Sequence, residues 1–168
     1  LKTLELPNSI TSYGDLIIHC STALEELTVG GSGLAESGEY ENRRFAIGEV
    51  NSLKKLNIRE GTVKIGARAF SNTPGNVIYG YYKLETVILP ESLQEIGNYA
   101  FMKSGILELR LSSNVSKLGT YSFNECKQMT SLVIEGNNLT IPTECFSQTS
   151  ALQTVHIMGG VVAIGEKA

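Results

Sequence analysis

The sequence has 168 residues, of which 42% are hydrophobic and 18% are charged, a composition typical of one globular domain. Its net charge of −3 and pI of about 5.5 argue against nucleic acid or an anionic membrane surface as a partner. No apolar run approaches the roughly 18 residues of a membrane span, so we expect no membrane insertion.

From its first residue the chain repeats the pattern apolar-x-x-apolar-x-apolar. The basic unit is 23 residues long, and its seven copies begin at Leu1, Leu24, Leu53, Leu84, Ile106, Met129 and Leu152. The alternation at the end of the pattern is the period-2 signature of a strand with one buried face. We therefore predict one strand in each of seven units.

A second set of positions repeats in phase after each strand. Seven residues beyond the last apolar strand position comes another apolar residue, usually followed by glycine, as in Ile96-Gly97 and Leu118-Gly119. Four residues after this bend lies a large apolar side chain: Ile18, Phe70, Phe101, Phe123 or Phe146. The segments that carry the phenylalanines open with capping-type residues, which predicts short helices or 3₁₀ turns that pack the ring inward.

One such unit cannot bury its own apolar face, so the units are expected to stack into a solenoid. We predict an α/β repeat fold over residues 1–168 as a single domain, a right-handed solenoid. A parallel β-sheet would line its concave face, and short helices or 3₁₀ turns its convex side. The phenylalanines would form one buried column. Since position 169 would carry the next one, we expect the segment to be a fragment of a longer array, with open ends able to associate end to end.

The segment from Leu84 to Phe101, LETVILPESLQEIGNYAF, resembles the BspA-type leucine-rich repeat, approximately L-x-x-I-x-I-P-x-S-V-x-x-I-G-x-x-A-F-x-x-C. The first unit resembles it too, with Pro7, Ser9, Ile10, Gly14 and Cys20, although Ile18 replaces the Phe. The resemblance covers nearly the whole chain and weakens between Gly30 and Arg44. It implies a leucine-rich repeat solenoid in a cell-surface or secreted protein that adheres to host proteins, matrix proteins or other microbes.

Two units are longer than the rest, with about six residues inserted near 35–44 and about eight within 73–83. Insertions in repeat proteins form loops on one face, often the binding face. The second insertion carries Tyr79, Tyr81 and Tyr82, whose rings either cover the neighbouring coil or offer a rigid contact surface for a partner. The first insertion is charged and is expected to be solvated.

The outward strand positions are the other candidate binding surface. Ile88 and Val133 are apolar where a solvated face would prefer polar residues, and Arg110 stands between them, a mixture typical of protein-binding surfaces. Against this, β-branched residues favour strands whatever their exposure. Beside this row lie Lys55, Arg59, Thr86, Glu108, Ser131 and Thr154. The candidate binding residues of the concave face are Asn57, Arg59, Ile88, Arg110, Val133 and His156.

No set of residues suggests catalysis, a metal site or a cofactor. Cys20, Cys126 and Cys145 have no metal-binding spacing and are read as small core residues. His156 has no suitably spaced carboxylate or cysteine to orient it. Asn114 and Asn138 begin glycosylation sequons, which matter only in a eukaryotic secretory pathway.

We therefore expect a non-enzymatic module and keep three functions open. The first is binding of a host or microbial surface protein through the concave face and the tyrosine loop. The second is glycan binding through Tyr79, Tyr81 and Tyr82. The third is a passive spacer within a larger surface protein, which would have no ligand.

Overall fold

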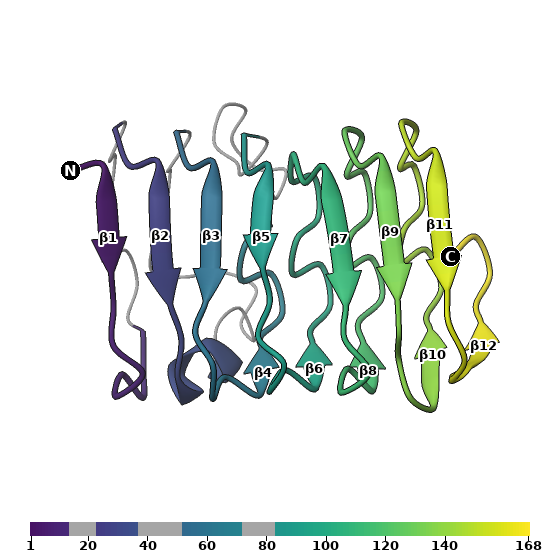
Figure 1. Ribbon diagram of the computed structural model, residues 1–168, viewed down its shortest axis with the longest axis horizontal. Helices are drawn as coiled ribbons and strands as arrows, with labels where there is room; N and C mark the ends of the chain where they lie inside the picture. Colours follow the sequence, from purple (N-terminus) through teal and green to yellow (C-terminus); the bar gives the residue numbers. More distant parts are fainter. Residues whose placement is uncertain (14–22, 37–51, 72–82) are drawn as a thin grey trace.

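The computed structural model describes residues 1–13, 23–36, 52–71 and 83–168. Each predicted unit contributes one long strand, and these strands lie side by side along the molecule (Figure 1). We call this side of the solenoid the long-strand wall. Its strands are β1 (Thr3–Glu5), β2 (Glu26–Val29), β3 (Lys55–Ile58), β5 (Thr86–Ile88), β7 (Glu108–Leu111), β9 (Ser131–Ile134) and β11 (Thr154–Ile157). All pairs within this wall are parallel, as the repeat pattern predicts.

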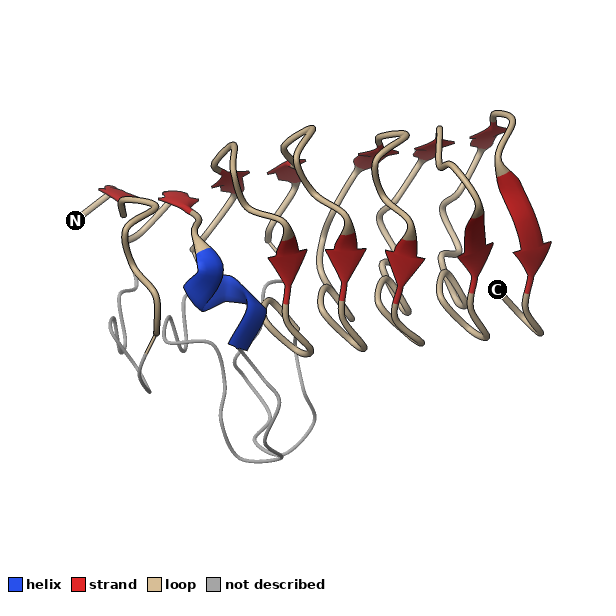
Figure 2. Cartoon of the chain, turned by 90° about the horizontal axis from the view of Figure 1, so that it is seen from below, coloured by secondary structure: helices blue, strands red, loops and turns tan. Residues whose placement is uncertain are grey.

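A second parallel sheet, which the repeat pattern did not predict, forms another side of the coils, one bend after the long strands. It consists of β4 (Lys64–Ile65), β6 (Glu95–Ile96), β8 (Lys117–Leu118), β10 (Leu139–Ile141) and β12 (Val161–Ile164). These strands pair without interruption in the order β12-β10-β8-β6-β4. We call this side the short-strand wall, and Figure 2 shows both rows of strands. The apolar residue before each glycine bend is part of this sheet.

The sequence predicts short helices or 3₁₀ turns around the phenylalanines. The helices are not confirmed, whereas single turns are present, closed by hydrogen bonds such as Ala100 N to Gly97 O at 3.3 Å. The segments before and at Phe70, Phe101, Phe123 and Phe146 are turns, and in the described part of the chain the single helix is the 3₁₀ helix η1 (Ser32–Glu36). The backbone of these turns bonds to the next coil, as when Phe101 N donates to Ser122 O at 2.8 Å. A positive φ interrupts each turn two residues before the ring, for example 59° at Tyr99. Such a residue breaks a right-handed helix.

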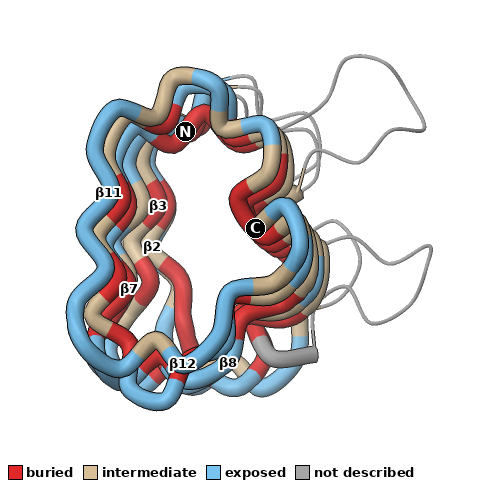
Figure 3. The backbone as a smooth tube through the Cα atoms, turned by 90° about the vertical axis from the view of Figure 1, so that its right-hand side faces the viewer, coloured by how far each residue is buried: buried red, intermediate tan, exposed pale blue. Residues whose placement is uncertain are grey.

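The predicted phenylalanine column is present. Neighbouring ring centroids are 5.3 Å apart along the whole series Phe70–Phe101–Phe123–Phe146, with interplanar angles of 16°, 5° and 7°. The first three rings are fully buried, and the apolar strand residues Leu56, Leu109 and Leu132 are buried with them. Figure 3, which looks along the stack, shows buried residues lining the interior of both walls. The shared core is therefore continuous from coil to coil. The right-handed sense and the concave and convex faces stay predictions.

Glycines in the bends let successive coils approach closely. A Cβ on Gly97 would lie 2.5 Å from Ala67 N, and one on Gly119 would lie 2.3 Å from Asn98 N. Both distances are shorter than any van der Waals contact, and the neighbouring atoms belong to backbone that has little room to move. The glycines that follow β6, β8 and β12 thus permit the close coil spacing, whereas Pro142 follows β10.

The long-strand wall is broken once, between β5 and β7. Hydrogen bonds join the strands in two separate sheets, β1-β2-β3-β5 and β11-β9-β7. The break coincides with a shorter unit, because five residues lead from Phe101 to Ile106 whereas six lead from Phe123 to Met129. The short-strand wall continues past the same point, since β6 pairs with β8.

Candidate functional site

The register of the strands places the candidate surface residues in two rows. Glu5, Thr28, Asn57 and Ile88 are neighbours across β1, β2, β3 and β5. Arg110, Val133 and His156 are neighbours across β7, β9 and β11. The break between β5 and β7 separates the two rows, so the structure does not bring the six predicted residues together into one unbroken ladder.

Arg59, predicted as a binding residue, is engaged within the protein. Its Nε donates a hydrogen bond to Leu6 O at 2.9 Å, and its Nη2 lies 3.1 Å from a carboxylate oxygen of Glu5. The side chain therefore reaches across β2 to the first coil. At the beginning of the same strands, Glu25 pairs with Lys2 at 3.6 Å and with Lys54 at 3.5 Å. Ion pairs within the protein thus lie at both ends of β1, β2 and β3.

Arg110 forms ion pairs with Glu91 and Glu135, which lie on the two sides of the break, and we call these pairs the Arg110 clasp. Its Nη1 lies 2.8 Å from Glu91 Oε1, which belongs to the unit of β5. Its Nε and Nη2 lie 3.0 and 2.8 Å from the two carboxylate oxygens of Glu135, which follows β9. The hydrogen bonds to Glu91 and Glu135 raise the pKa of Arg110 above its ordinary value. This bidentate geometry fixes the guanidinium on the surface.

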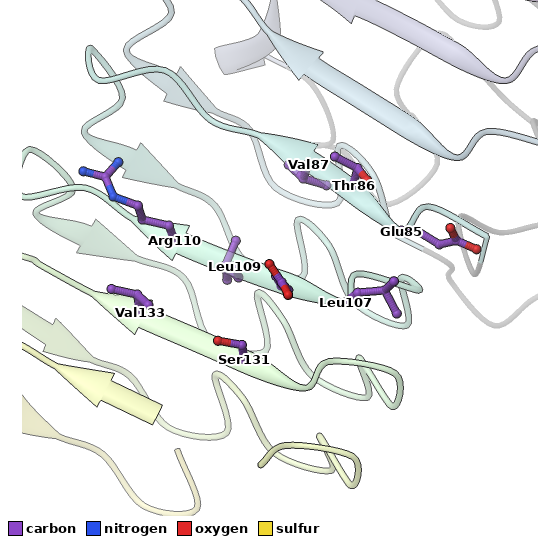
Figure 4. Close-up of a pocket in the computed structure, with 9 residues that line it drawn as sticks. Glu85, Thr86, Val87, Leu107, Leu109, Arg110, Ser131 and Val133 are labelled. Carbon is purple, nitrogen blue, oxygen red and sulfur yellow. The ribbon is translucent and has the colours of Figure 1, made fainter. Parts of the chain in front are cut away.

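A cavity of about 380 Å³ lies at the break, and we call it the strand-break cavity. Figure 4 shows side chains from β5, β7 and β9 around it. The apolar side chains are those of Val87, Leu107, Leu109 and Val133, and the polar ones are those of Glu85, Thr86, Glu108, Arg110 and Ser131. Arg110 and Val133 are among the predicted binding residues, and Thr86, Glu108 and Ser131 are among the residues predicted beside them. Glu85, Leu107, Val87 and Leu109 are lining residues that the outward pattern did not predict.

The backbone around the strand-break cavity is held at its two ends. Leu107 N donates to Glu85 O at 3.1 Å where the strands begin, and Asn114 Nδ2 donates to Glu91 O at 2.9 Å beyond their ends. Between these contacts no ladder bond joins the described residues of β5 and β7. Ser112, which follows β7, is 5% exposed, and its Oγ has no hydrogen-bond partner. The shorter unit could have indicated this place, but nothing in the sequence indicated that the ladder would be lost.

His156 lies on β11 in the last coil, whose long strand is exposed at all four positions. Tyr79, Tyr81, Tyr82 and nearly all of both insertions lie outside the described residues. Another aromatic pair, Tyr99 and Tyr121, stacks on the outside of the coils with centroids 5.1 Å apart. Arg68 covers the other face of Tyr99, with its Cζ 4.9 Å from the ring centroid. That ring therefore offers no free face to a sugar.

Two cysteines are buried members of the core, as expected. Burial raises the pKa of the Cys126 thiol to about 11 and that of Cys145 to about 12. Each sulfur lies against a serine hydroxyl of the preceding coil, Ser104 at 3.2 Å and Ser122 at 3.1 Å. Such thiols stay protonated at neutral pH and are poor nucleophiles. Cys20 lies outside the described residues.

Within the described ranges, no group of three or more His, Cys, Asp or Glu side chains is placed to hold a metal ion. None of the helices found there is long and apolar enough to span a bilayer.

Similar structures are bacterial leucine-rich repeat proteins and a pneumococcal vaccine antigen. The pneumococcal vaccine antigen PcpA is 25% identical with a TM-score of 0.57, and the match covers 93% of this chain and 30% of that one. A leucine-rich repeat protein from Bacteroides ovatus ATCC 8483 is 18% identical with a TM-score of 0.57 and coverages of 99% and 45%. The T. pallidum leucine-rich repeat protein TpLRR is 17% identical with a TM-score of 0.53 and coverages of 98% and 73%.

The chain thus spans less than half of PcpA and of the Bacteroides protein, and none of the three descriptions names an enzyme. The two less identical structures support the fold alone. No curated protein sequence matches the chain. The model of the BspA type leucine rich repeat region matches in 6 copies, over residues 1–78 and 49–168. Since these matches cover the whole sequence, the chain belongs to the BspA-type leucine-rich repeat family, as the repeat pattern had indicated.

Proposed function

We propose that the chain is a non-catalytic module that binds another protein through the outer face of β5, β7, β9 and β11. The observation that carries this proposal is the strand-break cavity, which gives the long-strand wall a concave, partly apolar site beside a fixed arginine. Recognition sites in proteins are typically concave and mostly apolar, with a few polar groups that fix orientation. Arginine and apolar anchors at the centre of a surface are typical of protein interfaces.

The exposed apolar side chains near the cavity support the same surface. Ile88 is 46% exposed and Leu107 is 38% exposed, each at an outward position where the neighbouring units mostly carry polar residues. By contrast, the outward residues of β1, β2 and β3 lie among paired charges. Covering the surface around Ile88 and Leu107 would give a partner the more favourable binding free energy. Burial of apolar area stabilises a complex, whereas exposed ion pairs contribute little.

We further propose that the module acts at a cell surface or after secretion, in adhesion to a host or microbial protein. The support is the family membership together with the likeness to PcpA, which is described as a vaccine antigen. A glycan ligand remains the second candidate. It rests on Tyr79, Tyr81 and Tyr82, whose clustering within one insertion favours stacking on sugar rings.

Arrays of purified matrix proteins, microbial surface proteins and glycans would test these proposals. We expect wild type to bind a protein, and Ile88→Ser with Val133→Thr to weaken that binding, while Thr28→Ala, at the same outward position on β2, leaves it unchanged. Binding of glycans alone, lost in Tyr81→Ala with Tyr82→Ala, would replace the protein proposal by the glycan one. Binding to neither array would leave the spacer function and overturn both.

A further inference from the structure

The chemistry of the strand-break cavity indicates which part of a protein partner it accepts. We propose that the cavity takes the side chain of a lysine or arginine that is carried on an extended segment of the partner. This inference rests on the proposed protein-binding function. It identifies the anchor residue of the partner, which neither the repeat family nor the similar structures specify.

The first argument is the charge around the cavity. Glu85 and Glu108 line it, and Arg110 is the single cation among its lining residues. Arg110 is already matched by Glu91 at 2.8 Å and by both oxygens of Glu135. The carboxylates of Glu85 and Glu108 therefore remain uncompensated within the lining. Lys55 lies one strand away beside Thr86 and is not part of the lining. A positively charged group is favoured there, and an acidic one is repelled.

The second argument is the apolar part of the lining, which distinguishes a side chain from a small ion. Val87, Leu107, Leu109 and Val133 provide an apolar surface beside the two carboxylates. Lysine and arginine carry a charged head on an apolar stem, and they bury the stem while the head stays at the polar rim. A bare divalent cation would need several oxygen ligands, and the described residues hold no cluster of three suitable side chains.

The third argument is the unpaired backbone at the break. At β2, β7 and β9, a carbonyl oxygen at the end of the strand accepts from the next coil, as Leu111 O does from Glu135 N at 2.9 Å. The corresponding bond from Ser112 N to Leu89 O is absent, and so are the ladder bonds of β5 with β7. The break therefore leaves both N–H and carbonyl groups outside the ladder, and the carbonyl oxygens can accept from a donor on the partner. An ammonium group brings three donors and a guanidinium five, whereas neither brings an acceptor.

The anchor is expected to sit on a protein segment because apolar surface continues outside the cavity. Ile88 is exposed beside the cavity and is not part of its lining, and Leu107 of the lining is itself 38% exposed, so residues next to the anchor would contact them. A free amine would lack these contacts and bind more weakly.

The test is an NMR titration of the ¹⁵N-labelled protein with blocked peptides of the form Gly-Ser-X-Ser-Gly, where X is lysine, arginine, norleucine or glutamate. We expect the lysine and arginine peptides to shift the amide signals of Val87, Leu109 and Arg110, with affinity that falls as salt is added. Glu108→Gln and Glu85→Gln should each weaken binding about threefold, and together about tenfold. Glu26→Gln should have no effect, because Glu26 holds the position of Glu108 on the intact strand β2.

Equal binding of the norleucine and lysine peptides would overturn the inference, and so would signal shifts confined to residues outside the cavity. If the arrays identify a protein partner while none of the basic peptides binds, the inference fails and the protein-binding function stands. If the arrays yield no protein at all, the proposed function fails first. Loss of lysine-peptide binding in Glu26→Gln as well as in Glu108→Gln would show that overall charge, not the cavity, attracts the peptide.

Discussion

The units that begin at Leu84 and Ile106 stack differently on their two walls. On the short-strand wall, β6 pairs with β8, and behind them Phe101 and Phe123 stack with ring centroids 5.3 Å apart and planes 5° apart. On the long-strand wall, β5 and β7 form no ladder, and a cavity of about 380 Å³ opens between them. The same two coils are therefore tightly joined on one side and separated on the other.

This difference shows that the core columns and the short-strand wall can hold neighbouring coils in register without a complete ladder on the long-strand wall. Most core side chains of the two coils at the break remain buried, among them Leu84, Phe101 and Leu109, whereas Val87 and Leu89 on the β5 side are partly buried. A site on the long-strand wall can consequently form at the expense of a few surface hydrogen bonds, each worth about 1 kcal/mol in net stability. Four substitutions would test how much each wall contributes to the stability of the stacked coils.

The largest effect is expected from Phe101→Ala, which empties the middle of the phenylalanine column. Phe101 is fully buried and contacts a ring on each side, so its removal leaves a cavity between three coils. Urea denaturation should show a loss of about 3–5 kcal/mol in the free energy of unfolding. Phe101→Leu keeps most of the volume and should lose less. A loss below about 1 kcal/mol for Phe101→Ala would contradict the role of the column in joining the coils.

The next largest effect is expected from Gly119→Ala on the short-strand wall. The new methyl would lie 2.3 Å from Asn98 N and from Gly97 C, both of them backbone atoms of the preceding coil. The coils must move apart there, which should lower the free energy of unfolding by about 1–3 kcal/mol. Gly159→Ala is the matched control, because its methyl would meet no atom within 4 Å. Equal stabilities of the two variants would mean that the coils are less closely joined at this wall than the structure has them.

Much of this architecture could be predicted from the sequence, because several positions repeat in phase. The long strands carry two alternating apolar positions each, and the phenylalanines mark one point per coil. The short strands could not be predicted, since β4, β6 and β8 contain only two residues and a single buried position each. The sequence predicts helices where the structure has turns, because the residue type of Tyr99 and Tyr121 does not indicate that their φ is positive.

The candidate site was predictable only in part. Val133 could be named because it breaks the polar pattern of the outward positions, and Arg110 because it stands between Val133 and Ile88. Arg110 and Val133 both line the cavity. The ion pairs of Arg110 with Glu91 and Glu135 depend on how three coils are aligned in space, which the residue order alone does not specify. The repeat pattern predicts Val87 and Leu109 as core residues. They line the cavity because the ladder between β5 and β7 is missing.

A smaller effect is expected from Arg110→Ala, which removes the clasp over the break. Its pairs with Glu91 and Glu135 lie at the surface, where such interactions contribute about 0.2–1 kcal/mol each. Loss of the clasp should therefore lower the free energy of unfolding by about 1 kcal/mol. A double-mutant cycle with Glu135→Ala would isolate the interaction from other effects of each substitution. Additive effects of the two substitutions would show that the clasp does not stabilise the break.

The smallest effect concerns pH and belongs to the short-strand wall, where Glu95 lies between Lys64 and Lys117. Its Oε1 is 2.9 Å from Lys117 Nζ and 3.6 Å from Lys64 Nζ. Although burial acts to raise it, the hydrogen bond from Lys117 and the charge of Lys64 hold the pKa of Glu95 below its ordinary value. The carboxylate is thus stabilised by folding. The resulting stability is complete above the pKa of an unfolded glutamate, about 4.3, and is lost as the pH falls through the lower folded value.

Urea midpoints measured from pH 6 to pH 3 should consequently fall more steeply for wild type than for Glu95→Gln. The difference is expected to be small, because Lys117 is 68% exposed and water screens its charge. Glu26→Gln on the long-strand wall should retain the wild-type slope. If Glu95→Gln also retained it, the Lys64–Glu95–Lys117 ladder would add nothing to the wall, and the strength of this side of the coils would reside in the strands and the phenylalanine column alone.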